Sequence, residues 1–142
     1  MDLVHPRPPF NLYDKAWPLR THYSHHPPIM MRMVQEDGRD IPGTVIDSII
    51  APGCVIEGAR VERSVVSSQV TVKKNANVQD SVIMEGVTVG EGAHIKNAII
   101  DKQVMIPPGE KVGYDLEQDR KRFAVTTSGI VIVAKKTAFI IE

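Results

Sequence analysis

The chain has 142 residues, and its 17 basic residues balance its 17 acidic ones. That length suits one modest domain with an arm and is too short for two full catalytic lobes. The balanced charge creates no field that would favour nucleic acid or an anionic membrane. Apolar runs of two to five residues are also far shorter than the roughly 20 residues that span a bilayer.

The residue types favour strands and a reducing compartment. Val and Ile together number 33, against four Leu, and β-branched side chains fit a pleated sheet better than a helix. The single cysteine, Cys54, cannot form an internal disulfide, and the first residues lack the charged and apolar regions of a signal peptide. We therefore expect a cytoplasmic, mostly β protein.

Residues 1–44 are expected to form an extended arm or linker. Seven of the ten prolines lie within the first 42 residues, where they disfavour long helices and central strands. Phe10, Tyr13 and Trp17 give this segment too much apolar surface for a solvated linker, so we expect it to pack against another part of the protein. Residues 35–40 are polar and rich in turn formers, which predicts a loop.

Residues 45–142 begin with a repeat whose period is 16 or 17 residues, and this repeat decides the fold. In each repeat a small residue precedes an apolar pair, and three apolar columns and one corner column follow. The first repeat is one residue shorter before its corner residue, Gly58. The small residues are Ser48, Ser64, Ser81 and Ala98; the apolar columns are Cys54, Val70, Val87 and Val104, then Ile56, Val72, Val89 and Ile106, then Val61, Val78, Ile95 and Val112. The corner column, Gly58, Asn75, Gly92 and Gly109, holds only residues that tolerate the left-handed backbone region.

This register predicts three short strands per repeat, joined by tight corners, with aliphatic side chains stacked inward from coil to coil. The expected fold is all-β: a left-handed parallel β-helix of about four hexapeptide-repeat coils, in which each coil hydrogen-bonds only its neighbours. A β-sandwich is the competing architecture. Strands joined by hairpins would not keep one columnar register over successive repeats, so the β-helix is favoured.

The segment after the last coil is expected to close the solenoid. Residues 115–123 place acids early and bases late, which suits one or two helical turns and their macrodipole. Residues 123–126 and 130–133 flank Thr127-Ser128-Gly129 and predict a hairpin. This hairpin is expected to cap the last coil, which otherwise offers unpaired backbone groups.

Catalytic motifs are scarce in this sequence, which has no Gly-rich phosphate loop, no Cys-x-x-Cys and no nucleophile elbow. We expect His22, His25 and His26 to lie in a solvated loop and not at a metal, and Cys54 to be a core residue and not a reactive thiol. His94 is predicted at a coil edge that resembles the place where hexapeptide-repeat acyltransferases keep a general base. No extruded loop and no evident orienting carboxylate accompany it.

Basic residues near the C-terminus form the remaining candidate site. Lys102 begins an edge of the last coil, and Lys135 and Lys136 follow the terminal hairpin strand. One interpretation is an anion site. The other is a set of solvated charges that protects a strand end, and the residues alone leave both open.

A set of motifs spread over nearly the whole chain is specific enough to indicate a family. The motifs are Ile99-Ile100-Asp101-Lys102, Ile106-Pro107-Pro108-Gly109, the tail at 128–133, the arm at 10–21, and the acidic-then-basic run at 117–123. Together they resemble the C-terminal β-helix domain, with its connecting segment, of the glucose-1-phosphate adenylyltransferase (ADP-glucose pyrophosphorylase) family. Sugar-1-phosphate guanylyltransferases have a similar solenoid, but the arm and the tail favour the adenylyl enzyme.

The resemblance implies a parent enzyme that joins ATP, with Mg²⁺, to glucose 1-phosphate, giving ADP-glucose and pyrophosphate for glycogen or starch synthesis. It also implies that the β-helix serves tetramer assembly and allosteric control by a sugar-phosphate activator bound between this domain and the catalytic one. Lys102 and Lys135 resemble positions where the family places basic activator ligands. The family's nucleotidyltransferase domain would precede Met1. We therefore expect this chain alone, as an excised domain or a truncated reading frame, to hold no metal or cofactor and to be inactive.

Two other functions stay open at this point. A small hexapeptide-repeat acyltransferase that uses His94 would form a trimer and turn over acyl-CoA unaided, so an acetyl-transfer assay would distinguish it. A scaffold that binds no ligand is the other alternative.

Overall fold

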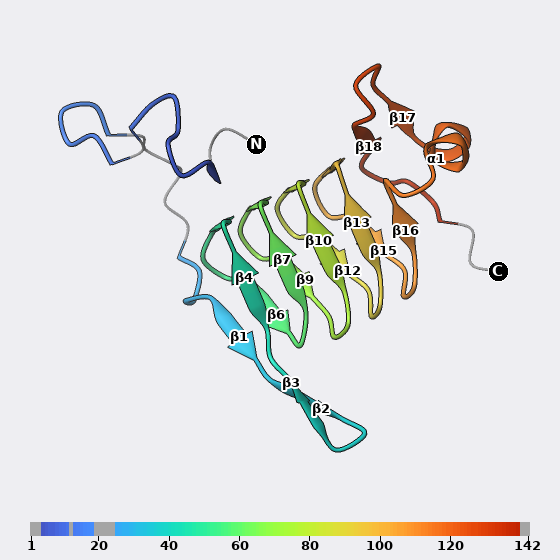
Figure 1. Ribbon diagram of the computed structural model, residues 1–142, viewed down its shortest axis with the longest axis horizontal. Coiled ribbons are helices and arrows are strands. Elements are labelled where there is room, and N and C mark those ends of the chain that lie inside the picture. The colour runs from blue at the N-terminus through green and yellow to red at the C-terminus, as the bar shows by residue number, and fades with distance from the viewer. Residues whose placement is uncertain (1–3, 12, 19–24, 140–142) are drawn as a thin grey trace.

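The structure is a computed structural model that describes residues 4–11, 13–18 and 25–139. Most of the described chain is a parallel β-helix with three faces, whose coils follow one another from left to right in Figure 1. Each coil contributes one strand to each face, and every pairing between successive coils is parallel. The prediction of an all-β fold built as a parallel β-helix of about four coils is confirmed.

The three faces are named here by their strands. Face 1 contains β1 (Met30–Arg32), β6 (Val55–Glu57), β9 (Thr71–Val72), β12 (Thr88–Val89) and β15 (Met105–Ile106). Face 2 contains β4 (Thr44–Ile46), β7 (Arg60–Glu62), β10 (Asn77–Gln79), β13 (His94–Lys96) and β16 (Lys111–Val112). Face 3 contains β5 (Ile49–Ile50), β8 (Val65–Val66), β11 (Val82–Ile83), β14 (Ala98–Ile100) and β18 (Val131–Val133), with β17 (Ala124–Val125) antiparallel at its edge.

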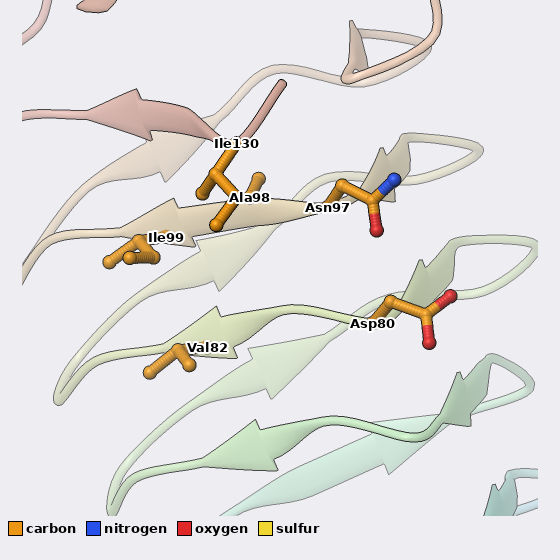
Figure 2. A pocket seen from close by; sticks show the side chains of 6 residues that line it. All are labelled: Asp80, Val82, Asn97, Ala98, Ile99 and Ile130. Atoms are coloured by element: carbon orange, nitrogen blue, oxygen red, sulfur yellow. The ribbon is translucent and has the colours of Figure 1, made fainter. Parts of the chain in front are cut away.

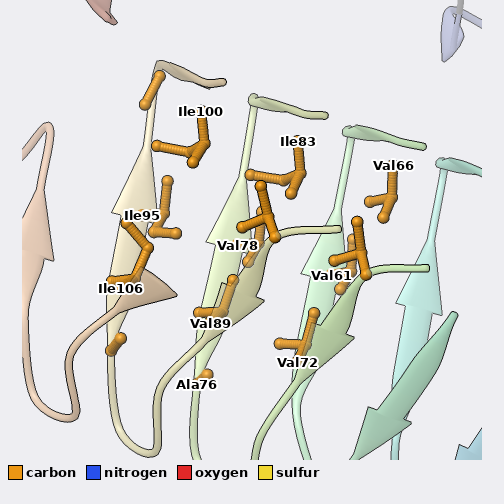
Figure 3. Packing of buried hydrophobic residues seen from close by; sticks show 14 of the residues in the cluster. Val61, Val66, Val72, Ala76, Val78, Ile83, Val89, Ile95, Ile100 and Ile106 are labelled. Atoms are coloured by element: carbon orange, nitrogen blue, oxygen red, sulfur yellow. The ribbon is translucent and has the colours of Figure 1, made fainter. Parts of the chain in front are cut away.

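The core lies inside the coils, where the predicted apolar columns point. Every member of the three columns is at most 3% exposed. Figure 3 shows the stacking, with Val61, Val78 and Ile95 repeated from coil to coil in the register of face 2. Because full burial of a Val or Ile side chain stabilises a fold by roughly 1.5–3 kcal/mol, these columns supply much of the driving force for folding.

All three corners of each coil use left-handed backbone, whereas the sequence predicted only one such column. The predicted residues Gly58, Asn75, Gly92 and Gly109 do have positive φ, between 53° and 71°. Two further columns share this conformation: Asp47, Arg63, Asp80 and Asn97, and Gly53, Gln69, Gly86 and Gln103. Arg and Gln do not favour positive φ by themselves, so the hydrogen bonds between coils impose it there.

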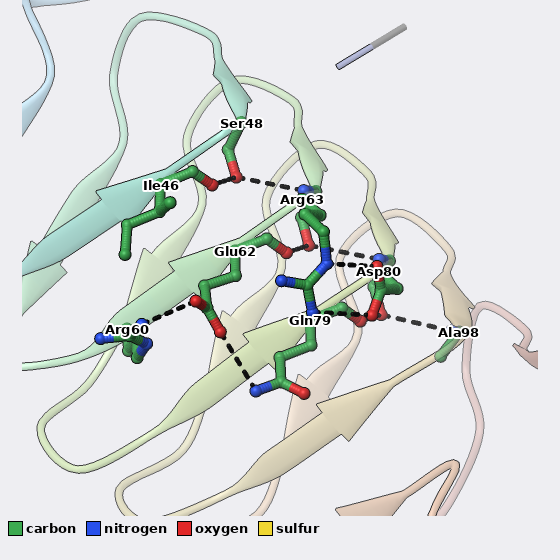
Figure 4. A network of polar contacts seen from close by, with 10 residues as sticks. Ile46, Ser48, Arg60, Glu62, Arg63, Gln79, Asp80 and Ala98 are labelled. Carbon is green, nitrogen blue, oxygen red and sulfur yellow. Dashed lines mark hydrogen bonds and ion pairs between the residues drawn. The ribbon is translucent and has the colours of Figure 1, made fainter. Parts of the chain in front are cut away.

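A ladder of serine hydroxyls joins the coils beside face 3 (Figure 4). The Ser64 N–H donates to Ser48 Oγ at 3.1 Å, and the Ser81 N–H donates to Ser64 Oγ at 3.2 Å. Each of these serine hydroxyls also donates to the carbonyl two residues earlier in its own coil. The ladder ends at Ala98, whose N–H donates to Ser81 Oγ at 3.2 Å. The small residue of each repeat is therefore a hydrogen-bonding element of the wall as well as a space filler.

The solenoid pairing begins upstream of residue 45, where the repeat was expected to start. β1 pairs in parallel with β6, although it lies within the segment 1–44 that was expected to be an arm. The expected loop at 35–40 is an antiparallel hairpin, β2 (Val34–Glu36) and β3 (Arg39–Ile41), extruded between β1 and β4. Asp37 and Gly38 both have positive φ, as a two-residue hairpin turn requires. Glu36 joins this hairpin to the coils through hydrogen bonds to Lys74 and Asn75.

The upstream arm carries exposed aromatic side chains. Tyr13 is 88% exposed and Trp17 is 82% exposed, so neither packs against the β-helix. Leu12 and residues 19–24, including His22, lie outside the described residues. The expectation that this arm packs against another part of the protein therefore stays a prediction, to be tested in a larger assembly.

The C-terminal cap forms as the sequence predicted. The short helix α1 (Leu116–Arg122) begins after Asp115, whose carboxylate accepts the N–H groups of Glu117 and Gln118. β17 and β18 form the hairpin, and β18 extends face 3 by pairing in parallel with β14. Within the described ranges, no helix has the length and hydrophobicity that a bilayer span requires.

Candidate functional site

The two predicted phosphate ligands are tied to one carboxylate. Lys102 follows β14 and Lys135 follows β18, and these strands are paired in register through Ile100 and Val133. The Lys102 N–H donates to Asp101 Oδ1 at 2.7 Å, and the Lys135 N–H donates to Asp101 Oδ2 at 3.1 Å. The structure thus brings together two lysines that are 33 positions apart in the sequence.

The electrostatics of this corner suit an anion. The N–H of Lys102, and after it that of Lys135, stabilises the ionised form of Asp101 and lowers the pKa of its carboxyl group below the ordinary value. Both lysine side chains are exposed, and neither ammonium group forms a hydrogen bond or an ion pair with a described residue. One carboxylate beside two ammonium groups leaves the corner with a net positive charge that a phosphate group can neutralise.

Asp101 is the residue of this corner that the sequence reasoning missed. In the sequence it stands within the motif Ile99-Ile100-Asp101-Lys102, which predicts no separate role for it. The available indication was its place directly after a strand, where a short carboxylate commonly accepts backbone N–H groups at a turn. Its function here is to fix the positions of the two lysine backbones.

His94, the candidate general base, lacks the partners that such a role needs. Its ring lies edge-on to Tyr114, with centroids 6.0 Å apart and an interplanar angle of 87°. It borders a pocket of about 310 Å³ beside Arg60 and Asn77 on face 2. Among the described residues no carboxylate hydrogen-bonds to the ring, and the corner before β13 is a tight turn through Gly92. Among the described residues, no hydrogen-bond partner orients the imidazole for proton transfer.

Cys54 lies in the core, as the sequence predicted. Cys54 is 1% exposed, its Sγ donates to the Ser67 carbonyl at 3.0 Å, and burial raises the pKa of its thiol. A buried, protonated thiol is a weak nucleophile. In the described part of the chain, no group of three or more His, Cys, Asp or Glu side chains is arranged to hold a metal ion.

Several curated proteins with similar sequences share one name. A glucose-1-phosphate adenylyltransferase from Koribacter versatilis is 43% identical over 135 residues, which is 95% of this chain and 32% of that protein. Proteins of the same name from an Arthrobacter species and from Hydrogenovibrio crunogenus are 48% and 46% identical, over 97% and 94% of this chain. The chain spans about a third of the length of these curated relatives. The resemblance inferred from the sequence is confirmed.

A family-level match agrees with the fold. The sequence family described as "GlmU-like, C-terminal hexapeptide" matches residues 29–133. Its limits include β1 at one end and β18 at the other, so they coincide with the solenoid that the structure shows. The chain therefore belongs to the GlmU-like C-terminal hexapeptide family.

Proposed function

We propose that this chain is the regulatory and oligomerisation domain at the C-terminal end of a glucose-1-phosphate adenylyltransferase. The parent enzyme joins ATP and glucose 1-phosphate into ADP-glucose and pyrophosphate in the cytoplasm, for glycogen or starch synthesis. Its nucleotidyltransferase domain is the partner of this domain and binds ATP with Mg²⁺, whereas this domain contributes no catalytic residue. The intact enzyme is a homo-oligomer, a tetramer as in the family it resembles.

The observation that carries the regulatory part is the shared carboxylate of Asp101. It holds Lys102 and Lys135 at one corner, with both ammonium groups exposed to solvent. Two lysines at one corner bind a phosphate group as point charges, with ionic hydrogen bonds stronger than neutral ones. The ligand class that fits is a phosphorylated sugar, whose dianionic group complements the net positive corner.

Activation requires that the ligand distinguishes two states of the enzyme. An activator changes the rate only if it binds one state more tightly than the other. A site at the edge of this domain meets that requirement when the nucleotidyltransferase domain supplies further ligands in one of the two states. The 142-residue chain alone then holds part of the ligand set and binds sugar phosphates only weakly.

The test uses the full-length enzyme and an activator titration. Initial rates of ADP-glucose formation are measured against the concentration of fructose 1,6-bisphosphate, used here as a sugar-phosphate probe. Lys135→Ala removes one charged ligand and should raise the half-activation concentration about tenfold, equivalent to about 1.4 kcal/mol. Lys136→Ala is the matched control: Lys136 is adjacent and exposed, but its N–H does not contact Asp101. Equal half-activation concentrations in wild type and Lys135→Ala would mean that Lys135 is only a solvated charge.

A further inference from the structure

A pocket of about 310 Å³ lies where the base of the β2–β3 hairpin meets face 2, and is called the face 2 pocket below. Ile41, at the end of β3, and Pro42 give it an apolar side, and the first residues of β4, β7, β10 and β13 also line it. Lys102 and Lys135 follow strands of face 3. The face 2 pocket is therefore separate from the corner that holds those two lysines.

The polar side chains of the pocket come from one row on face 2. Pairing between neighbouring strands places the row in register, so its side chains follow one another at about 4.8 Å. The row consists of Thr44, Arg60, Asn77 and His94. Hydroxyl, amide and imidazole groups can each donate and accept hydrogen bonds. Among the described residues, none of these three side-chain groups of the row has a hydrogen-bond partner.

Asn77 carries the clearest sign of an unmet need. Its Oδ1 is buried and accepts no hydrogen bond from a described residue. A buried acceptor of this kind loses on folding the hydrogen bond that water gives it in the unfolded chain, so it lowers stability unless a partner is supplied. A ligand hydroxyl can supply that partner once a neighbouring side chain of the row moves aside. The Arg60 side chain, which is 50% exposed, has room to do so.

The charge of the pocket argues against an anion. Arg60 is the only permanently charged residue among the described residues that line it. Its Nη2 lies 2.6 Å from Glu62 Oε1, and this ion pair is drawn in Figure 4. Arg60 is therefore already neutralised, although its other N–H groups remain available as donors. The corner at Lys102 and Lys135 differs, because two ammonium groups face one carboxylate there.

Size and surface chemistry narrow the ligand class further. Ligand pockets begin at about 300 Å³, so this one suits a single ring and not a nucleotide. A neutral hexose has hydroxyl groups around its ring and C–H groups on its faces, which match the polar row and the apolar side of the pocket.

The hollow of about 350 Å³ on face 3, between β11 and β14, lacks this combination (Figure 2). Aliphatic side chains provide most of its lining, and Arg63 binds both carboxylate oxygens of Asp80 at 2.8 and 3.1 Å. Of its described lining side chains, only Asn97 keeps an unpaired hydrogen-bonding group. A hollow of this kind cannot satisfy several hydroxyl groups at once.

We propose that the face 2 pocket binds a neutral hexose unit through the row from Thr44 to His94. Asn77 and His94 exchange hydrogen bonds with its hydroxyl groups, Arg60 donates to them, and the ring packs beside Pro42. The unit is either a free monosaccharide or the terminal residue of an oligosaccharide. This inference does not depend on the proposed function, since every group that it uses belongs to the described part of this chain.

The experiment follows backbone amide shifts of the 142-residue chain by NMR during titration with glucose. The proposal predicts saturable shifts at Arg60, Asn77 and His94 with one shared Kd, roughly millimolar. The amides of Lys102 and Lys135 should not move. A parallel titration with maltotriose identifies the source of the sugar. A similar Kd indicates a free monosaccharide, and a Kd at least tenfold lower indicates the end of an oligosaccharide.

Variants separate a binding role of Asn77 from a structural one. Asn77→Val should raise the Kd for glucose at least tenfold. It should not lower Tm, because it removes a buried unpaired oxygen and Val favours strands. Gln79→Ala is the matched control: Gln79 lies on the same strand and face but does not line the pocket, so its Kd should equal that of wild type. His94→Gln makes the same binding test if Asn77→Val folds poorly.

Three results would overturn the sugar site. The first is the absence of saturable shifts at Asn77 and His94 with both glucose and maltotriose. The second is a titration with inorganic phosphate that moves these amides further than glucose does, which would indicate an anion site. The third is a wild-type Kd for glucose in both Asn77→Val and His94→Gln.

Discussion

Removing one hydroxyl from the serine ladder tests how the coils are held together. Ser81 is fully buried; its Oγ donates to the Gln79 carbonyl at 2.6 Å and accepts the Ala98 N–H at 3.2 Å. In Ser81→Ala the buried N–H of Ala98 keeps no acceptor, and so does not regain in the folded state the hydrogen bond that water offers it in the unfolded state. Leaving a buried donor unpaired in this way costs about 1–3 kcal/mol.

That loss is large enough to measure by thermal unfolding of the 142-residue chain. For a domain of this size it corresponds to a fall in Tm of roughly 3–15 °C. Ser68→Ala is the matched control, because Ser68 is half-buried but its hydroxyl makes no hydrogen bond with a described residue. The control should stay within about 0.5 kcal/mol of wild type. If Ser81→Ala melts at the wild-type temperature, the ladder does not stabilise the wall and the reasoning is refuted.

Three other changes test the core, the cap and the candidate site. Val89→Asp places an unpaired carboxylate at a position that is 0% exposed, so the variant should fail to fold. A cooperative melt at the wild-type temperature, followed by circular dichroism, would contradict the assignment of Val89 to an inward column. Gly113→Ala brings a methyl group against the Lys96 carbonyl at a φ of +87° and should lower Tm by loosening α1; an unchanged Tm would contradict this close approach. The pKa of the Asp101 carboxyl group is lowered, so its contribution to stability is complete above the ordinary value near 3.9 and is lost as pH falls through the folded-state pKa. An NMR titration of the Lys102 and Lys135 amides should show one shared midpoint below that ordinary value. A midpoint at the ordinary value would contradict the shift.

The inward columns could be predicted from the sequence because burial selects residues strongly. A position that repeats every 16 or 17 residues and is always apolar has few alternatives to an inward column, and the structure buries each one. The corner column that contains Gly58 and Asn75 was equally predictable, because these residue types tolerate positive φ. The other two corner columns could not be predicted from the sequence, since Arg63, Gln69 and Gln103 adopt positive φ only where hydrogen bonds to neighbouring coils impose it.

The candidate site was predictable only in part. Lys102 and Lys135 were candidates from the residues themselves and from the resemblance, but the residue that joins them, Asp101, acts through hydrogen bonds to backbone N–H groups. Such contacts depend on the register between β14 and β18, and β15, β16, α1 and β17 separate these two strands in the sequence. The hairpin at Asp37-Gly38 could have been found, because that dipeptide is a common signature of a two-residue turn.

The corner formed by Lys102 and Lys135 can be examined directly in solution. Backbone amide shifts of the 142-residue chain are recorded by NMR during a titration with fructose 1,6-bisphosphate. A phosphate site at this corner predicts saturable shifts at both lysine amides with one shared Kd, roughly millimolar, because the chain holds only part of the ligand set. The amides of Lys74 and Lys96, which lie on other parts of the solenoid, should not move. Shifts that do not saturate, or that are no larger at Lys102 and Lys135 than at those two reference lysines, would contradict a phosphate site at this corner.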